Sequence, residues 1–367
     1  MASPLSVGVE EEFLLVDSEH LDVRGRSAMV LRSAYDQVGG DVQPELYSGE
    51  VESATPVCWT LDELGGALRR RRELLGRGAA EAGCRLFASG THPFARWQDQ
   101  RITPKARYLG LAEEYQQVAH ETMICGQHIH VGIPEEEQRI DVLNRVRPWL
   151  GVFTALGSNS PFWEGLDTGY ASYRTLVFRR WPTNRVPRRF EDWADYRRVV
   201  GTLVASGAVD DPTKLYWDVR PSERFPTLEF RVGDVCLRVA DAVCIAGLVR
   251  ALVARCLADA AAGLPAPEPL AEVLESAVWK AARFGLGAEL IDPLTSRSTP
   301  AREVVGRLLN LVEAPLRAAG DAETVDDGIE RILEGGTGAA RQRSVVERGG
   351  DLKAVARFVA AETSGGL

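Results

Sequence analysis

The sequence predicts an α+β fold in which a mainly antiparallel sheet is backed by helices. The first observation is a set of short segments whose polar and apolar residues alternate, as in strands with one face on the core. The second is a series of longer segments with helical spacing of apolar residues between and after these strands. We find no internal repeat and no long linker, so residues 1–367 are expected to form a single domain.

The first part of the chain alternates strands with helices. Strands are predicted over residues 7–16, 46–53, 85–89 and 123–133. Helices are predicted over 28–38, 61–82 and 106–119. Gly39-Gly40 is a stop signal for the first helix, and Thr60 is a candidate N-cap for the second.

The second part is predicted to be mainly helical. A helix over 142–156 is interrupted near Pro148, and a loop rich in Ser, Gly, Asn and Pro follows over 157–173. After a helix at 190–206, two strands at 215–219 and 227–232 are joined by RPSERFP, as in a hairpin or corner. A long helix over 237–263 follows, and the remainder is helical apart from a glycine loop, GGTGAAR, at 335–341.

Composition and charge restrict the possible partners. The net charge of −9 gives no support for a nucleic-acid or anionic-membrane partner. The most apolar segment, 240–263, contains four charged residues and is predicted to be a buried or amphipathic helix, not a membrane span. The N-terminus lacks the pattern of a signal peptide, and the six cysteines form no CxxC pair. We therefore expect a cytoplasmic protein with reduced, buried cysteines.

Polar pairs with a spacing of two recur in four predicted strands. SVGVEEEFLLVD places Glu10 and Glu12 on one strand face and Glu11 on the other. The same spacing occurs in three more segments, with the pairs Glu50 and Glu52, His128 and His130, and Glu229 and Arg231. One such strand is consistent with a solvated sheet face, but four indicate a single concave surface on which carboxylates, imidazoles and guanidinium converge.

Such a surface is suited to a hard cation and a phosphate. Carboxylates side by side repel each other, and burying them unpaired costs free energy unless a cation lies between them. Oxygen-rich clusters with few histidines and no cysteine suit Mg²⁺ or Mn²⁺. Arginines then fit as anion clamps. The candidates are Arg231 and the arginines of YRTLVFRRWPTNR, namely Arg174, Arg179, Arg180 and Arg185.

Each feature also has a purely structural interpretation. The three consecutive glutamates are compatible with a charged, exposed strand edge, and the HxH pair with a hydrogen-bonded core histidine. Glu229 and Arg231 can form a simple salt bridge. The basic run 69–72 is interpreted as a solvated helix face. Only the joint occurrence of four polar strand faces favours a functional site.

Several common catalytic motifs are absent from the sequence. It has no GxxxxGK[ST], no HExxH, no GxSxG and no complete GxGxxG. If a nucleotide binds, its phosphates are therefore held by metal and arginine. The segment GGTGAARQR, with Arg341, is a candidate loop to wrap a phosphate or close over the site.

Seven motifs, in order over nearly the whole chain, resemble the glutamate–cysteine ligase type 2 family, the YbdK-like carboxylate-amine ligases. They are GVEEEF, PELYSGEVESATP, CGQHIHVG, SNSPFW, YRTLVFRRWPTN, TLEFRVGDV and GTGAARQ. The resemblance implies a glutamine-synthetase-like fold, an antiparallel sheet funnel. It also implies ATP-dependent amide formation through an acyl phosphate, with divalent metal bridging the phosphates. A homodimer is implied as well.

The resemblance also implies roles for individual residues. The metal ligands would be Glu10, Glu12, Glu45, Glu52, His128 and Glu229. Arg231 would stabilise the transferring phosphoryl group, and Arg174 would hold a substrate carboxylate or phosphate. The alternation of residues points independently to all of these except Glu45 and Arg174. His130 would serve the substrate or support the ligands.

The substrates are less well defined than the chemistry. Glutamate is the expected acid, reacting through its γ-carboxyl group, with cysteine or another amine as its partner. The alternatives are the same chemistry on a different acid or amine, a metal-dependent amide hydrolase, and a non-catalytic regulator that has kept the metal site. The arginine-rich segment 174–185 favours phosphate chemistry over plain hydrolysis.

Overall fold

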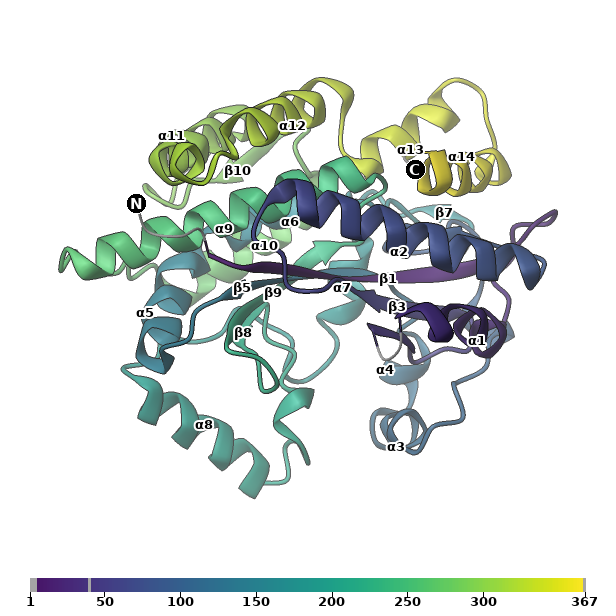
Figure 1. The fold of residues 1–367 in the computed structure, drawn as a ribbon, viewed down its shortest axis with the longest axis horizontal. Helices are drawn as coiled ribbons and strands as arrows, with labels where there is room; N and C mark the ends of the chain where they lie inside the picture. Colours follow the sequence, from purple (N-terminus) through teal and green to yellow (C-terminus); the bar gives the residue numbers. More distant parts are fainter. Residues whose placement is uncertain (1–4, 39–40, 366–367) are drawn as a thin grey trace.

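A computed structural model describes residues 5–38 and 41–365. Its centre is a seven-stranded antiparallel sheet in the order β2-β3-β1-β5-β9-β8, with β4 paired to the far end of β1. The bounds are β1 Val7–Asp17, β2 Val42–Pro44, β3 Glu50–Ala54, β4 Cys84–Phe87, β5 Gly126–Gly132, β8 Val219–Pro221 and β9 Thr227–Asp234. The α+β class with an antiparallel sheet is confirmed (Figure 1).

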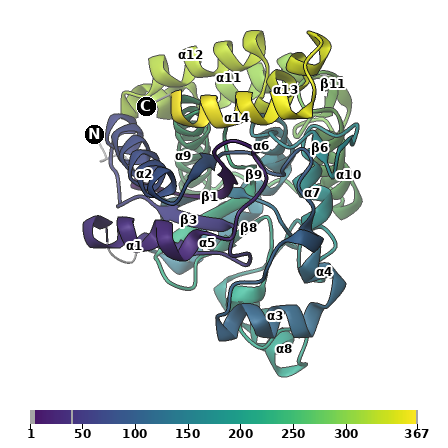
Figure 2. The same cartoon turned by 90° about the vertical axis from the view of Figure 1, so that its right-hand side faces the viewer.

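Long helices cover one face of this sheet. The helices α2 (Leu61–Glu81) and α9 (Val239–Ala261) lie along it, and a second layer packs over them (Figures 1 and 2). The members of that outer layer are α11 Ala301–Ala319, α12 Ala322–Gly335, α13 Gly338–Glu347 and α14 Leu352–Gly365.

The other face of the sheet is only partly covered. Shorter helices and their loops surround it, as the lower part of Figure 1 shows. They are α1 Ser27–Val38, α3 Ala106–Tyr115, α4 Gln117–His120, α7 Tyr173–Phe178 and α8 Trp193–Ala205. The helices α5 (Glu136–Val146), α6 (Leu150–Leu156) and α10 (Ala271–Phe284) close one side of the molecule, and two small hairpins, β6–β7 (162–167) and β10–β11 (289–300), connect helices.

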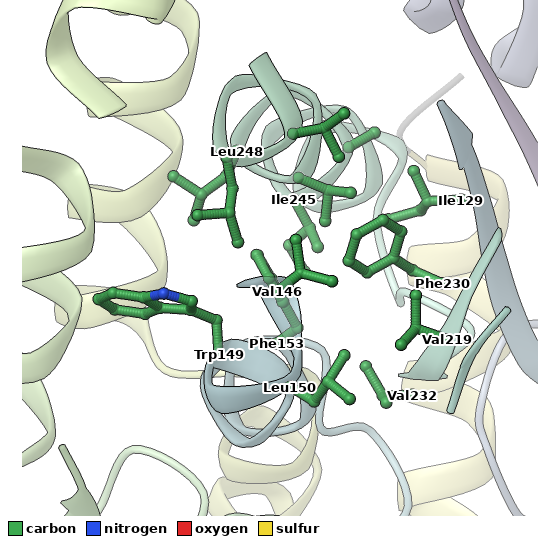
Figure 3. Packing of buried hydrophobic residues seen from close by; sticks show 14 of the residues in the cluster. Ile129, Val146, Trp149, Leu150, Phe153, Val219, Phe230, Val232, Ile245 and Leu248 are labelled. Carbon is green, nitrogen blue, oxygen red and sulfur yellow. The ribbon is translucent and has the colours of Figure 1, made fainter. Parts of the chain in front are cut away.

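Strand alternation sends the apolar residues to the helix-covered face. Ile129 of β5 and Phe230 of β9 pack against α6 and α9, with Phe153 and Ile245 among their neighbours (Figure 3). Burying each large apolar side chain contributes about 1.5–3 kcal/mol relative to leaving it exposed. This core holds the sheet rigid from behind and leaves the opposite face free for polar side chains.

Several predicted boundaries are confirmed. Thr60 caps α2 by accepting a hydrogen bond from the Glu63 N–H at 3.1 Å, and Glu63 completes a capping box. The predicted helix 142–156 is interrupted by a 3₁₀ turn at Arg147–Trp149, which contains Pro148. The stop signal at Gly39-Gly40 lies outside the described residues.

Other predictions need correction. The predicted helix 106–119 is two helices, because Gln116 adopts a φ of 46° between α3 and α4. The predicted glycine loop 335–341 is wrong over most of its length: Gly336, with a φ of 80°, ends α12, and Thr337 then caps α13. Arg341 therefore lies in a helix. The predicted strand 215–219 begins only at Val219, after a 3₁₀ turn at Pro212–Lys214.

Two further expectations concern the state of the cysteines and the possibility of a membrane-spanning helix. All six cysteines are buried free thiols. Within the described part of the chain, no helix has both the length and the apolar character needed to cross a membrane.

Candidate active site

The register of the central strands brings the predicted polar pairs together. On β1, Glu12 lies opposite Glu52 of β3, and Glu10 lies opposite His128 of β5. On the next pair of strands, His130 lies opposite Glu229 of β9. The β5–β9 ladder has an irregularity between Gln127 and Ile129, and bulges of this kind are common beside active sites.

The two histidines leave ring nitrogens available for a ligand. His128 Nδ1 is 3.0 Å from Glu10 Oε2, and His130 Nδ1 is 2.9 Å from Thr227 Oγ1. The Nε2 atoms of both rings are buried without a hydrogen-bond partner in the described residues. Burial, helped by the Arg231 charge, lowers the pKa of His128. A neutral imidazole with a free Nε2 is the form that ligates metals.

Two triads of side chains are close enough to share a cation. Candidate ligand atoms of Glu10, Glu52 and His128 lie within 4.8 Å of one another, and so do those of Glu10, His130 and Glu229. Glu52 is held by Gln43, whose Nε2 donates to its Oε2 at 2.7 Å. The donor set of carboxylates and imidazoles fits Mg²⁺ or Mn²⁺.

Glu45 and Glu52 are the carboxylates of this cluster that the chain's own cations do not neutralise. Burial, reinforced by Glu12, raises the pKa of Glu45 to about 7. Burial, together with Glu10 and Glu45, raises the pKa of Glu52 well above its ordinary value. Burial also opposes ionisation of Glu10, but the neighbouring His128 and His130 hold its pKa below the usual range, with His130 Nε2 3.4 Å from Glu10 Oε1. A divalent cation would supply the missing charge, so the residues present fit the metal that the sequence predicts.

Glu229 is fixed between two arginines. Arg231 donates to its Oε1, and Arg220 Nε donates to its Oε2 at 2.9 Å. Arg220 also donates to the carbonyl oxygens of Thr213 and Leu215. Although burial works to raise the pKa of Glu229, the charges of Arg220 and Arg231 hold it below the usual range. This carboxylate is therefore ionised and aligned before any ligand binds.

Arg174 is a buried cation near the acids. It is only 3% exposed, and no hydrogen bond or ion pair from its guanidinium is found within residues 5–38 and 41–365. Its Cζ lies 5.5 Å from the centroid of the Phe178 ring. A Cβ at Gly126 would lie 2.1 Å from Arg174 Nη2, so the glycine of CGQH is needed for this approach.

These side chains line one open cavity of about 270 Å³ on the partly covered face of the sheet. Glu10, Glu12, Glu45, Glu52, His128, His130, Glu229 and Arg231 all contribute to its wall. Arg174 lines a deeper continuation of the same space, which shares Glu12, Glu45, His128 and Arg231 with the outer part. The volume is near the lower end of the range for ligand pockets, and the cavity opens to solvent.

The rim of the cavity carries basic residues that sequence reasoning missed. They are Lys105 and Arg107 before and on α3, and Arg220 and Arg224 on β8 and its hairpin. Arg220 could have been found from the hairpin, because a strand paired with β9 places it opposite Glu229. Lys105 and Arg107 carry no comparable signal, since their approach depends on tertiary packing.

The structure does not bring four of the predicted arginines to this cavity. Arg179 donates to Asp218, with its Nη1 3.1 Å from Oδ1, and Arg180 pairs with Glu121. Arg341 donates to Asp241 at 2.8 Å from within α13. Arg185 bonds the Pro182 carbonyl and is exposed. Their expected nucleotide contacts therefore have no support in this geometry, because each guanidinium is held elsewhere.

Two of the sequence motifs meet away from the cavity. Asn159 of SNSPFW donates to the carbonyl oxygens of Ala88 and Val235, and its Oδ1 accepts from Gln342 of GTGAARQ at 2.8 Å. A Cβ at Gly338 would lie 2.1 Å from Asn159 Oδ1. These motifs join the C-terminal helices to the sheet.

The middle glutamate of the opening run faces the helices. Glu11 and Arg72 of α2 are each 1% exposed and form a buried ion pair, with Arg72 Nε 3.1 Å from Glu11 Oε2. Arg72 also donates to the carbonyl oxygens of Cys236 and Leu237. The interpretation of 69–72 as a solvated helix face is therefore wrong for Arg72.

Solved structures share this fold. A glutamate–cysteine ligase from Francisella tularensis, in complex with AMP, superposes with a TM-score of 0.71 and 13% identity over 99% of this chain and 89% of that one. A bifunctional glutathione synthetase from Pasteurella multocida gives a TM-score of 0.74 and 14% identity over 99% of this chain and 53% of that one. The funnel-like antiparallel sheet is thus the fold of known ligases.

The family follows from closer matches. The model of "Glutamate-cysteine ligase family 2(GCS2)" matches residues 6–358. Relatives in Rhodopirellula baltica and Streptomyces coelicolor are 38% and 42% identical, over 98% and 95% of this chain and 96% of each relative. Both carry the name "Putative glutamate--cysteine ligase 2". The chain belongs to glutamate–cysteine ligase family 2, and it is an enzyme of the ligase class.

Proposed function

We propose that this enzyme joins a carboxylic acid to an amine at the expense of ATP, through an acyl-phosphate intermediate. Glutamate is the expected acid, with cysteine or another amine as acceptor. The observation that carries the proposal is that one cavity contains both acids without a neutralising cation and an arginine without a bound anion. Glu45 and Glu52 there lack a neutralising cation, while the Arg174 guanidinium has no ion-paired anion in the described residues. A metal–nucleotide complex and an acid substrate together satisfy both.

The metal would be held by the acid cluster. Glu10, Glu52 and His128 form one set of candidate ligands, Glu10, His130 and Glu229 form the other, and Glu12 and Glu45 line the space beside them. A divalent cation bound there would neutralise phosphate oxygens during the transfer. The similarity to a ligase in complex with AMP supports nucleotide binding at this fold.

The arginines of the cavity would act on the substrates. The substrate carboxylate attacks the γ-phosphorus of ATP, and the bond to ADP breaks. Arg231, oriented by Glu229, would stabilise charge on the transferring phosphoryl group. Arg174 would bind a carboxylate or phosphate in the deeper part of the cavity. The amine then attacks the carbonyl carbon, phosphate leaves, and the amine nitrogen loses a proton.

The homodimer, the cytoplasmic location and the single domain stay predictions.

The experiment is an ADP-release assay with Mg²⁺ and ATP, crossing amino acids as acyl donors with a panel of amines that includes cysteine. Mass spectrometry identifies the products. ADP formation that requires both an acid and an amine, together with the amide mass, supports the proposal. Release of ADP only with a non-glutamate acid or an unusual amine keeps the chemistry and changes the substrate. Amide cleavage without ATP would instead show a hydrolase.

A further inference from the structure

The deeper part of the cavity, called here the deep lobe, contains a second buried group without a partner. Glu50 of β3 is 1% exposed and lines the lobe together with Arg174. Its Oε2 accepts from the Tyr47 N–H at 3.1 Å, whereas its Oε1 has no hydrogen-bond partner in the described residues. A buried acceptor left without a donor costs about 1–3 kcal/mol, so this oxygen is suited to a donor from a ligand.

Glu50 is not part of either cation triad. The two sets of converging ligand atoms contain Glu52, its neighbour on the same strand face, but not Glu50. Tyr47 holds the carboxyl group from the turn before β3. The lobe is also partly apolar, with Leu111, Ile124 and Trp181 in its wall. Glu50 is therefore placed for a substrate that enters the lobe, apart from the metal cluster.

Arg174 offers a cation in the same lobe. Its guanidinium is 3% exposed, its Nε has no hydrogen-bond partner, and no ion pair of Arg174 is found within the described ranges. Its charge favours the ionised form of the buried Asp234, but that carboxyl group is bonded by Ser160, Ser172 and the Asn159 N–H. The lobe thus presents one free acceptor and one free cation, held apart from each other on β3 and α7. A ligand that carries an ammonium and a carboxylate on adjacent atoms supplies both missing partners.

We propose that the deep lobe binds the head group of an α-amino acid, with Glu50 Oε1 accepting from its ammonium group and Arg174 donating to its carboxylate. Glu50 is then a specificity-determining residue, because it distinguishes an amino acid from the same acid without its amino group. This inference rests on the proposed function for the identity of the reaction, but the binding event can be measured alone.

The test is calorimetric binding of two matched ligand pairs to the full chain with Mg²⁺ and a non-hydrolysable ATP analogue. The pairs are L-glutamate with glutarate and L-aspartate with succinate, which differ only in the amino group. The wild-type protein is expected to bind at least one amino acid about tenfold or more tightly than its partner, because a site built for an N–H donor rejects a ligand without one. Glu50→Gln should reduce that ratio to about twofold or less by weakening the amino acid alone.

Control variants separate this role from a structural one. Glu19→Gln, on an exposed residue, should leave both affinities unchanged. Glu50→Leu, which removes the acceptor entirely, should give the same loss of discrimination as Glu50→Gln, provided that melting curves show folded protein. Equal weakening of both ligands of a pair, or no preference for either amino acid in the wild type, overturns the proposal. Selective binding without any amide product would leave the head-group site standing and refute the ligase reaction.

Discussion

The three consecutive glutamates of β1 have different partners on the two faces of the sheet. On the helix-covered face, Glu11 is completely satisfied by Arg72 from the same chain. On the open face, Glu10 lies beside Glu52, His128 and His130, and the Nε2 atoms of both histidines have no hydrogen-bond partner in the described residues. The charges on the helix-covered face are paired within the chain and stabilise the fold. On the open face, some polar atoms have no partner in the described residues and are available to a ligand. Carboxylates of one strand can therefore serve stability or binding, depending on whether the chain itself supplies their partners.

The largest expected effect comes from removing one charge on the open face. Glu52→Gln should lower turnover by about 100-fold or more, because it removes a candidate metal ligand while keeping the shape of the side chain. The fold should remain intact, since one less carboxylate in the cluster relieves repulsion. ADP release, Mn²⁺ titration and melting curves with and without Mg²⁺ check this. Normal turnover with unchanged Mg²⁺ dependence would remove Glu52 from the metal site.

The matched substitution on the helix-covered face should lower stability and leave metal binding unchanged. Glu11→Gln leaves the Arg72 guanidinium buried without its counter-ion and should reduce the free energy of unfolding by about 3–5 kcal/mol. Chemical denaturation measures the loss, and Mg²⁺ affinity of the folded protein should be unchanged. A double variant, Glu11→Gln with Arg72→Met, should recover part of the loss. If Glu11→Gln is as stable as the wild type, the Glu11–Arg72 pair does not contribute to stability, and the proposed difference between the two faces is wrong.

A smaller effect on stability is expected from His92, a buried histidine whose two ring nitrogens are both hydrogen-bonded within the chain. His92 Nε2 donates to the Leu21 carbonyl at 2.8 Å, and Nδ1 accepts from the Ala95 N–H at 2.9 Å, so the ring is neutral. Burial lowers the pKa of His92 to about 3 from an ordinary value of 6.5. Between these values the unfolded chain takes up a proton that the folded one does not, so stability falls as the pH falls. The loss from pH 7 to pH 5 should be about 2 kcal/mol.

Denaturation curves at several pH values test that expectation. His92→Gln should flatten the dependence between pH 7 and pH 5, even where it lowers stability overall. His20→Gln, at an exposed histidine, serves as the control and should follow the wild-type slope. If His92→Gln keeps the full slope, other groups are responsible for the acid sensitivity.

The sequence predicted which acids and histidines share the cavity better than it predicted which arginines reach it. Alternation alone placed Glu10, Glu12, Glu52 and His128 on a common surface, because strand geometry fixes which residues share a face. Residues on helices were harder to place. Arg179 follows Arg174 by five residues, which turns it about 140° around a helix axis and away from the cavity.

Arg72 and Glu45 show two other reasons for incomplete prediction. Arg72 continues the apolar stripe of Leu64 and Leu68 at a spacing of four, so the helical period did carry a signal for its burial, but the charge outweighed that signal. Glu45 precedes β3 and depends on the turn at 47–49, which no periodicity describes. Its place in the cavity was accessible only through the resemblance to a family.

The junction between Asn159 and Gln342 has a consequence for how the protein is made. Asn159 and the Ser89 hydroxyl both contact Gln342, and the Ala88 N–H donates to Thr363 Oγ1 at 3.0 Å. Synthesis begins at the N-terminus, so these groups on the sheet emerge from the ribosome long before their partners in α13 and α14. These hydrogen bonds therefore form only after α13 and α14 have been synthesised, which makes the docking of these two helices a late step of folding.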